Sequence, residues 1–102
     1  MIVKAIKPFG EFEDMELTTL SEMQEFVGGY IQALPVANKT LLVCNDEGKL
    51  MGLEPTLALI GQQGNVIDIV VGNVFLCGAG VEDFTDITEQ GFREAMTRMR
   101  VM

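Results

Sequence analysis

The stretch TLLVCNDEGKLMGL, residues 40–53, decides the fold. Residues 40–44 are β-prone and nearly all apolar, which predicts a central strand. Residues 45–48 form a turn sequence, because Asn45 is favoured at the first position of a turn and Gly48 tolerates a positive φ. Residues 49–53 then return as the predicted partner strand. Strands joined by a tight turn pair antiparallel, so we expect a mostly antiparallel sheet.

Further β-prone segments lie on both sides of this stretch. Residues 1–7 alternate apolar side chains with lysines, which predicts a half-buried strand that ends at Pro8. Residues 57–60 suit either a helical turn or a strand. Residues 66–71 and 74–77 are two β-prone runs joined at Gly72-Asn73. That join is compatible with a hairpin turn, but the order Gly-Asn favours a bulge in one bent strand.

A capping box predicts the first helix. The Thr19 hydroxyl can accept from the backbone N–H of Glu22 while the Glu22 side chain reaches back, and Pro35 ends the predicted helix over residues 19–34. The glycine pair at 28–29 then lies inside the helix and suggests either close packing against a strand or a backbone that another group approaches. An apolar stripe at helical spacing is expected to face the sheet: Leu20, Met23, Phe26, Val27, Tyr30, Ile31 and Leu34.

A second helix is predicted near the C-terminus. Thr88 is its expected N-cap, and Ile87 and Phe92 take the positions of a hydrophobic staple. Arg98 and Arg100 are expected in its last turn, where cations complement the helix dipole. Its apolar stripe is Phe92, Ala95, Met96 and Met99.

These elements predict one α+β domain over residues 1–102. We expect a small, mostly antiparallel sheet of about four to five strands with two helices packed on one face.

Composition excludes several function classes. The chain has 102 residues with 7 Lys and Arg against 15 Asp and Glu, a formal net charge of −8. Direct nucleic-acid binding needs a cationic face, so it is not expected. There is no His, which excludes histidine-based mechanisms, and two Cys are too few for a zinc cage. Cys44 and Cys77 lie among apolar neighbours and are expected to be reduced and buried.

The sequence carries no signal for a membrane or for secretion. Residues 1–7 lack a long apolar region and a cleavage site, so they do not form a signal peptide. The longest apolar stretch, residues 66–80, is interrupted by Asp68, Gly72 and Asn73 and is too short to span a bilayer. We therefore expect a cytoplasmic protein.

The residues offer little for catalysis. Ser21 is the only serine and has no base beside it in sequence, and a reactive thiolate at Cys44 or Cys77 would need a nearby cation. Adjacent acids such as Glu82-Asp83 are typical of solvated loops, and Asp68 is expected to point to solvent from its strand. The glycine-rich segments lack the residues of phosphate loops. No catalytic residue, metal or cofactor is predicted.

Two groups of residues are candidates for binding. Glycine-rich turns can bind anions through backbone amides, so a small nucleotide-like ligand has these candidate contacts: Gly28, Gly29, Tyr30, Asn45, Gly78 and Gly80. A partner protein has an acidic stretch as its candidate contact: Glu11, Glu13, Asp14 and Glu16. The acidic stretch is more typical of a solvated loop, or of an edge strand whose charges resist edge pairing, than of a dedicated docking strip.

Four motifs in order carry a family resemblance. They are LxxxQxxVGGYI from Leu20, VCNDEGKL from Val43, IDIVVGNVFL from Ile67 and DFxxITEQ from Asp83. Their order and spacing, over roughly residues 1–98, resemble the uncharacterised bacterial family called domain of unknown function 3846. Residues 53–57 depart from the usual family pattern, and Gly91 stands where a charged helix former is commoner.

The resemblance implies an accessory protein of a phage, plasmid or conjugative element, often encoded near antirestriction genes, with no established catalytic residues. We therefore expect a non-catalytic acidic protein that binds a host or element protein, and a homo-oligomer is compatible with this role. The alternative is a small-ligand binding protein that uses the glycine-rich turns. A carboxylate-rich face suits the first class, because it can compete for Arg and Lys arrays that normally hold DNA.

Overall fold

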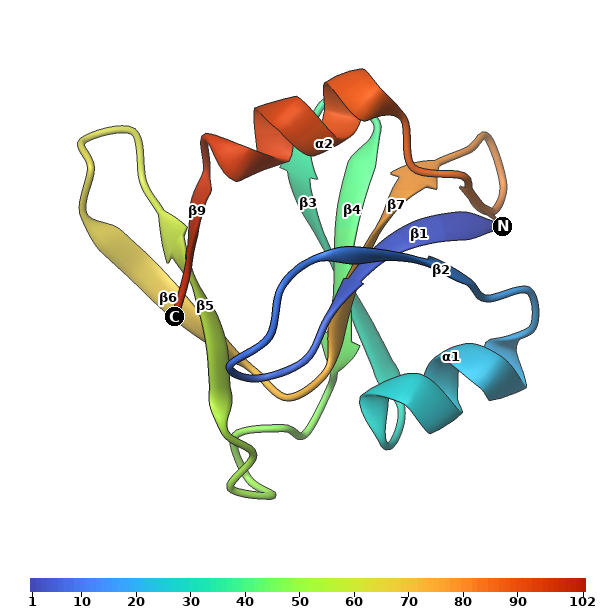
Figure 1. Ribbon diagram of the computed structural model, residues 1–102, viewed down its shortest axis with the longest axis horizontal. Coiled ribbons are helices and arrows are strands. Elements are labelled where there is room, and N and C mark those ends of the chain that lie inside the picture. Colours follow the sequence, from blue (N-terminus) through green and yellow to red (C-terminus); the bar gives the residue numbers. More distant parts are fainter.

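The computed structural model describes residues 1–102, and its strands form two antiparallel sheets (Figure 1). The larger sheet has the order β2-β1-β7-β4-β3, with β8 paired to β7. Its strands are β1 (Ile2–Ile6), β2 (Glu13–Glu16), β3 (Ile31–Ala37), β4 (Thr40–Asn45), β7 (Val74–Ala79) and β8 (Phe84–Thr85). The smaller sheet, β6-β5-β9, consists of β5 (Pro55–Ile60), β6 (Val66–Val71) and β9 (Met99–Val101). The predicted α+β class is confirmed, and the second sheet is an addition to it.

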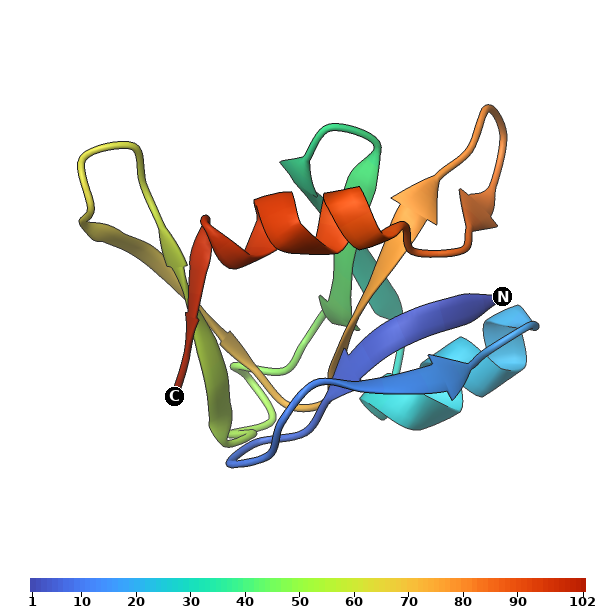
Figure 2. The same ribbon diagram turned by 45° about the horizontal axis from the view of Figure 1, so that its top comes forward.

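The two helices, α1 (Leu20–Val27) and α2 (Glu89–Met96), lie on opposite faces of the larger sheet (Figures 1 and 2). Side chains alternate along its strands, so Val43 and Phe75 join the core under α1, whereas Leu42 and Leu76 join the core under α2 and the smaller sheet. The prediction of both helices on one face is therefore wrong. The larger sheet is apolar on both faces, so each face must be buried by a different element that packs against it.

The first helix begins as predicted but ends early. Glu22 donates its backbone N–H to Thr19 Oγ1 at 3.1 Å, and the Thr19 N–H donates to Glu22 Oε1 at 2.9 Å, which completes the capping box. The helix ends at Val27, because Gly28 adopts a left-handed φ of 86° and donates its N–H to Gln24 O. The glycines are thus a helix terminus rather than a weak helix interior.

Residues 31–37 are strand β3, not a helix continuation. Pro35 is compatible with this strand because β3 is an edge of the larger sheet, where a missing N–H breaks no ladder. Of the predicted stripe, Met23 and Val27 are buried, but Leu20 and Tyr30 are 55% and 72% exposed. The helical spacing of apolar residues across Gly28 was therefore fortuitous.

The turn at residues 45–48 is confirmed, but its partner strand is not. Glu47 donates its N–H to Asn45 Oδ1 at 2.8 Å, which makes a tight turn. Residues 49–52 continue as turns, residues 49–53 pair with no strand, and β4 instead pairs with β3 and β7. Residues 55–60 form a strand, which decides that alternative.

The join at Gly72-Asn73 moves the chain from one sheet to the other. β6 and β7 belong to different sheets and do not pair, so the join is neither a hairpin nor a bulge within one strand. Gly72 has φ 78°, and a Cβ added to it would lie 2.7 Å from Leu53 Cδ1. The left-handed φ therefore favours a glycine at this corner, and a larger residue would also have to move the Leu53 side chain.

The second helix begins at the predicted residue. Gly91 donates its N–H to Thr88 Oγ1 at 2.9 Å. The helix ends at Met96, so Arg98 and Arg100 lie beyond its last turn and Met99 belongs to β9. Met99 still packs in the same core as Ala95, because β9 follows the helix directly.

Candidate functional site

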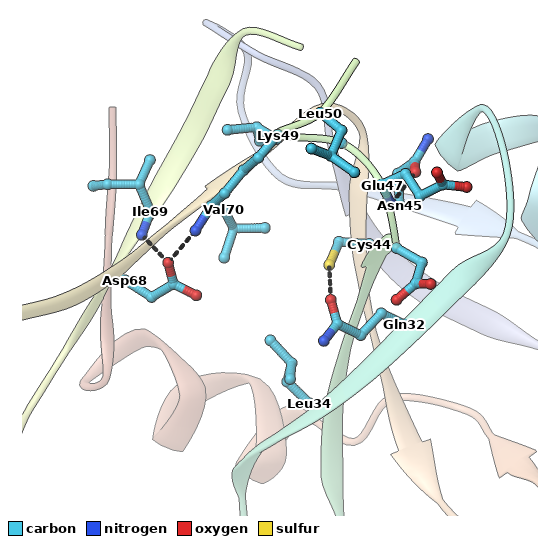
Figure 3. Close-up of a pocket in the computed structure, with 13 residues that line it drawn as sticks. Gln32, Leu34, Cys44, Asn45, Glu47, Lys49, Leu50, Asp68, Ile69 and Val70 are labelled. Carbon is cyan, nitrogen blue, oxygen red and sulfur yellow. Dashed lines mark hydrogen bonds and ion pairs between the residues drawn. The ribbon is translucent and has the colours of Figure 1, made fainter. Parts of the chain in front are cut away.

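A cleft of about 250 Å³ lies between the two sheets (Figure 3). One wall comes from β3 and β4, the other from β6, and the segment after β4 borders it. Strand alternation places Gln32 beside Leu34 on the first wall and Asp68 beside Val70 on the second. The buried side chains of Cys44 and Val70 lie deeper, so the cleft has apolar walls with polar groups among them.

An ion pair spans one side of the cleft. Lys49 Nζ lies 2.5 Å from Asp68 Oδ1, and the same oxygen accepts from the Ile69 N–H at 2.8 Å. The hydrogen bond from Lys49 is the main cause that lowers the pKa of Asp68, so this carboxyl is ionised at neutral pH. Both contacts use Oδ1, and the other carboxylate oxygen points into the cleft (Figure 3).

The opposite wall presents a thiol and a carboxamide. The Cys44 thiol donates to Gln32 Oε1 over a long distance of 4.0 Å. Burial raises the pKa of Cys44, and the carboxylates of Asp46 and Asp68 add to that effect. The thiol therefore stays protonated at neutral pH and is a weak donor rather than a nucleophile.

The lining carries more acid than base. Asp46, Glu47 and Asp68 face a single cation, Lys49. A concave surface with this balance attracts positive charge and disfavours phosphate.

The structure separates the six candidate ligand residues into two groups. Gly28, Gly29, Tyr30 and Asn45 lie at the end of β4, whereas Gly78 pairs with Thr40 at its start and Gly80 follows. Five residue steps along a strand separate these ends by roughly 17 Å. Only Asn45 among the six lines the cleft.

Packing accounts for these glycines. The Asn45 side chain donates to Val27 O at 3.1 Å, and a Cβ on Gly29 would lie 3.1 Å from that same nitrogen. A Cβ on Gly78 would lie 2.6 Å from Asp86 O, and one on Gly80 would lie 2.7 Å from Asp83 O. The lack of a side chain at Gly29 therefore leaves space for the Asn45 amide. The lack of side chains at Gly78 and Gly80 leaves space for the segment around β8.

Three residues of the acidic stretch, Glu13, Asp14 and Glu16, lie on β2 at the free edge of the larger sheet, and Glu11 lies just before this strand. β2 pairs only with β1, so the edge-strand alternative is confirmed. Asp14 lies opposite Lys4 and 2.6 Å from its Nζ. Glu11, Glu13 and Glu16 are exposed and form no ion pair or side-chain hydrogen bond.

The residues considered for catalysis lie in separate parts of the structure: Ser21, Cys44, Cys77, Glu82 and Asp83. Burial raises the pKa of Cys77 to about 12, and both cysteines are free, as predicted. Ser21 is exposed at the start of α1, and Glu82 and Asp83 are exposed in the loop before β8. No cluster of three or more metal-ligating side chains is present. Each of the two helices has only eight residues, so neither could span a membrane.

Sequence reasoning missed the cleft. The one sequence signal for the cleft is Asp68, because it interrupts an apolar run. The sequence predicts that Asp68 faces solvent. The structure places it, half-exposed, on the cleft wall. The sequence predicts a helix at Gln32 and Leu34 and a strand at Lys49, and the structure shows β3 at the first two and a turn at the third. Only the meeting of the two sheets brings these residues together.

Of the comparisons with known proteins, the one with protein-family models found a match. No curated protein and no solved structure matches the chain. A family model described as "Domain of unknown function (DUF3846)" matches residues 1–100, which is nearly the whole chain. The order of the four motifs and this match agree, and the protein belongs to the DUF3846 family.

Proposed function

We propose that the protein is a non-catalytic accessory protein that acts by binding another protein through the acidic stretch formed by Glu11, Glu13, Asp14 and Glu16. One observation carries the proposal. Glu13 and Glu16 on the edge strand β2, and Glu11 just before it, are exposed and form no ion pair within the chain. A partner with an Arg- and Lys-rich surface would supply the missing cations.

The edge position adds to this proposal. Charged edge strands resist pairing with other strands, so this edge is protected against unspecific β-pairing. The carboxylates remain available to a basic surface, and the net charge of −8 would steer such a partner toward the protein. Binding of this kind is fast and sensitive to salt.

The state of the thiols supports the absence of catalysis in this proposal. Cys77 has its pKa raised to about 12 by burial, and the pKa of Cys44 is also raised. Both are therefore protonated at neutral pH, and neither is an activated nucleophile.

The setting of this function follows from the family resemblance. In this proposal, the protein is the product of a phage or another mobile element, with a host or element protein as its target. Its proposed location, the cytoplasm, is based on the sequence signals and not on the family. A carboxylate surface that competes for a DNA-binding groove is one physical route to such an effect.

The test replaces the four carboxylates of the acidic stretch by their amides. The partner is first isolated by cross-linking with the wild-type protein, and its association rate is then measured by stopped flow at low and moderate salt. The quadruple amide variant should associate more slowly and lose most of the salt dependence, with little change in its melting temperature.

A second quadruple variant controls for net charge: Glu25→Gln, Glu54→Gln, Glu82→Gln and Asp83→Asn, all at exposed positions. It should retain most of the wild-type rate. Equal rates for the acidic-stretch variant and the wild type would show that the stretch is only solvated surface.

A second candidate function is small-ligand binding. The observation in its favour is the cleft between the sheets, not the glycine-rich turns, which are occupied by packing. Native mass spectrometry of protein purified from its host tests this candidate: a retained small mass supports it, and a retained protein supports the first.

A further inference from the structure

The cleft between the two sheets combines apolar walls with hydrogen-bond acceptors, and we infer that it binds a cationic head on a short alkyl stem. This is the chemistry of an arginine or lysine side chain and of a free alkylguanidinium or alkylamine. The inference deepens the small-ligand candidate and does not depend on the acidic stretch.

The acceptors on the two walls would hold the cationic head. The free oxygen of Asp68 points into the cleft from β6, and Gln32 lies across from it on β3, where its Oε1 accepts a long hydrogen bond from the Cys44 thiol and keeps a second lone pair for a cation (Figure 3). Asp46 and Glu47 add negative charge at the border of the cleft. Ionised acceptors of this kind form short, strong hydrogen bonds with guanidinium and ammonium groups.

The apolar walls would hold the alkyl stem. Leu34 and Val70 come from the two opposite walls and line the space between the polar groups. Long cationic side chains bind in this way, with the methylene groups against apolar surface and the charge among acceptors.

An ammonium group of the chain itself already contacts Asp68 in the cleft. The ammonium group of Lys49 lies 2.5 Å from Asp68 Oδ1, at the end of a flexible stem on the turn segment after β4. Both side chains are largely exposed, at 63% and 43%, so the pair is weak and exchangeable. An incoming cation would displace the Lys49 ammonium group and form the ion pair with Asp68 in its place.

The size of the cleft limits the ligand. Drug-sized ligands occupy pockets of roughly 300 to 1,000 Å³, whereas this cleft measures about 250 Å³. It therefore suits one side chain or a small amine. A nucleotide is disfavoured both by size and by the acidic lining.

The test titrates two probes into the full chain and follows the methyl signals of Leu34 and Val70 by NMR. The probes are n-butylguanidinium, a free cation, and acetyl-Gly-Arg-Gly-amide, an arginine within a peptide. Neutral n-butanol serves as the control for the stem. We expect both cationic probes to shift these signals saturably and n-butanol to leave them unchanged.

Three variants assign the binding to named groups. Asp68→Asn should weaken binding by about tenfold, the loss expected for one charged hydrogen bond. Lys49→Met should strengthen it by about two- to fivefold, because an exposed ion pair no longer competes. Glu82→Gln, which removes one exposed carboxylate elsewhere, should bind like the wild type.

The outcomes separate the sources of the ligand. Tighter binding of the peptide indicates a partner's arginine, and tighter binding of n-butylguanidinium indicates a free small cation. No saturable shift, or equal affinity of Asp68→Asn and the wild type, overturns the inference. The acidic-stretch amide variant should still bind both probes, so failure of the partner-binding proposal would remain a separate result.

Discussion

Replacing Asn45 by Ala should destabilise the protein substantially, because this side chain links three segments. Asn45 is 5% exposed; its amide donates to Val27 O at the end of α1, and its Oδ1 accepts from the Glu47 N–H in the following turn. The substitution therefore disconnects α1 from β4 and removes the hydrogen bond that closes the turn. If Asn45 served only a ligand, its loss would cost little stability.

The magnitude follows from the two hydrogen bonds to backbone groups, because the third, from the same amide to the Met51 thioether at 3.4 Å, has a weak acceptor. Each contributes roughly 1 kcal/mol net, and a buried carbonyl left without a donor costs roughly 1 to 3 kcal/mol more. The Glu47 N–H is near solvent and can be hydrated, whereas Val27 is 2% exposed. We therefore expect a loss of about 2 to 4 kcal/mol, which for a domain of this size lowers the melting temperature by about 10 to 20 °C.

Urea unfolding measures this loss as a shift in midpoint at constant slope. Asn45→Asp separates the two bonds, because it keeps the acceptor for Glu47 but loses the donor to Val27; it should be at least as unstable as Asn45→Ala. Asn65→Ala is the matched control, since Asn65 is exposed and its side chain forms no hydrogen bond. A change below about 0.5 kcal/mol for Asn45→Ala, no more than at an ordinary surface position, would refute the reasoning.

Three further predictions concern stability and the thiols. Gly78→Ala should destabilise by about 1 to 3 kcal/mol, measured by thermal unfolding, because a Cβ would lie 2.5 Å from Thr85 Oγ1 and 2.6 Å from Asp86 O; an unchanged midpoint would contradict this close contact. Asp68→Asn should change unfolding stability in urea by less than about 1 kcal/mol, since its ion pair with Lys49 is exposed; a larger loss would contradict the weakness of this pair. The stability should fall as pH rises above 9, because burial raises the pKa of Cys77 from 9.0 to about 12 and the unfolded chain then loses a proton that the folded chain keeps. Cys77→Ala should flatten the alkaline part of a urea-midpoint profile, and an identical profile for this variant and the wild type would exclude the thiol as the cause.

Local chemistry made part of the fold predictable. The capping box at Thr19, the N-cap at Thr88 and the turn at Asn45 each depend on residues within three positions, and all three were confirmed. The edge position of the acidic stretch was anticipated as one alternative, because repeated like charge is poorly accommodated between two strands.

The errors came from patterns whose meaning depends on distant neighbours. The apolar spacing of residues 31–34 fits a helix, but these residues pair with β4, and Pro35 is tolerated because no strand lies beyond β3. Gly28 was the local signal for the helix end, since glycine in a left-handed conformation commonly follows the last helical residue. The cleft had almost no local signal.

The sequence by itself determined the α+β class, the helix starts, the reduced cysteines, the acidic charge and the family. The tertiary structure alone decided that β6 and β7 belong to different sheets, that the helices cover opposite faces, and that Gln32, Lys49 and Asp68 meet in one cleft. The physical reason is the sequence separation over which each interaction acts. Caps, turns and charge act over a few residues, whereas strand pairing and burial depend on which distant segment supplies the hydrogen bonds and covers the apolar face.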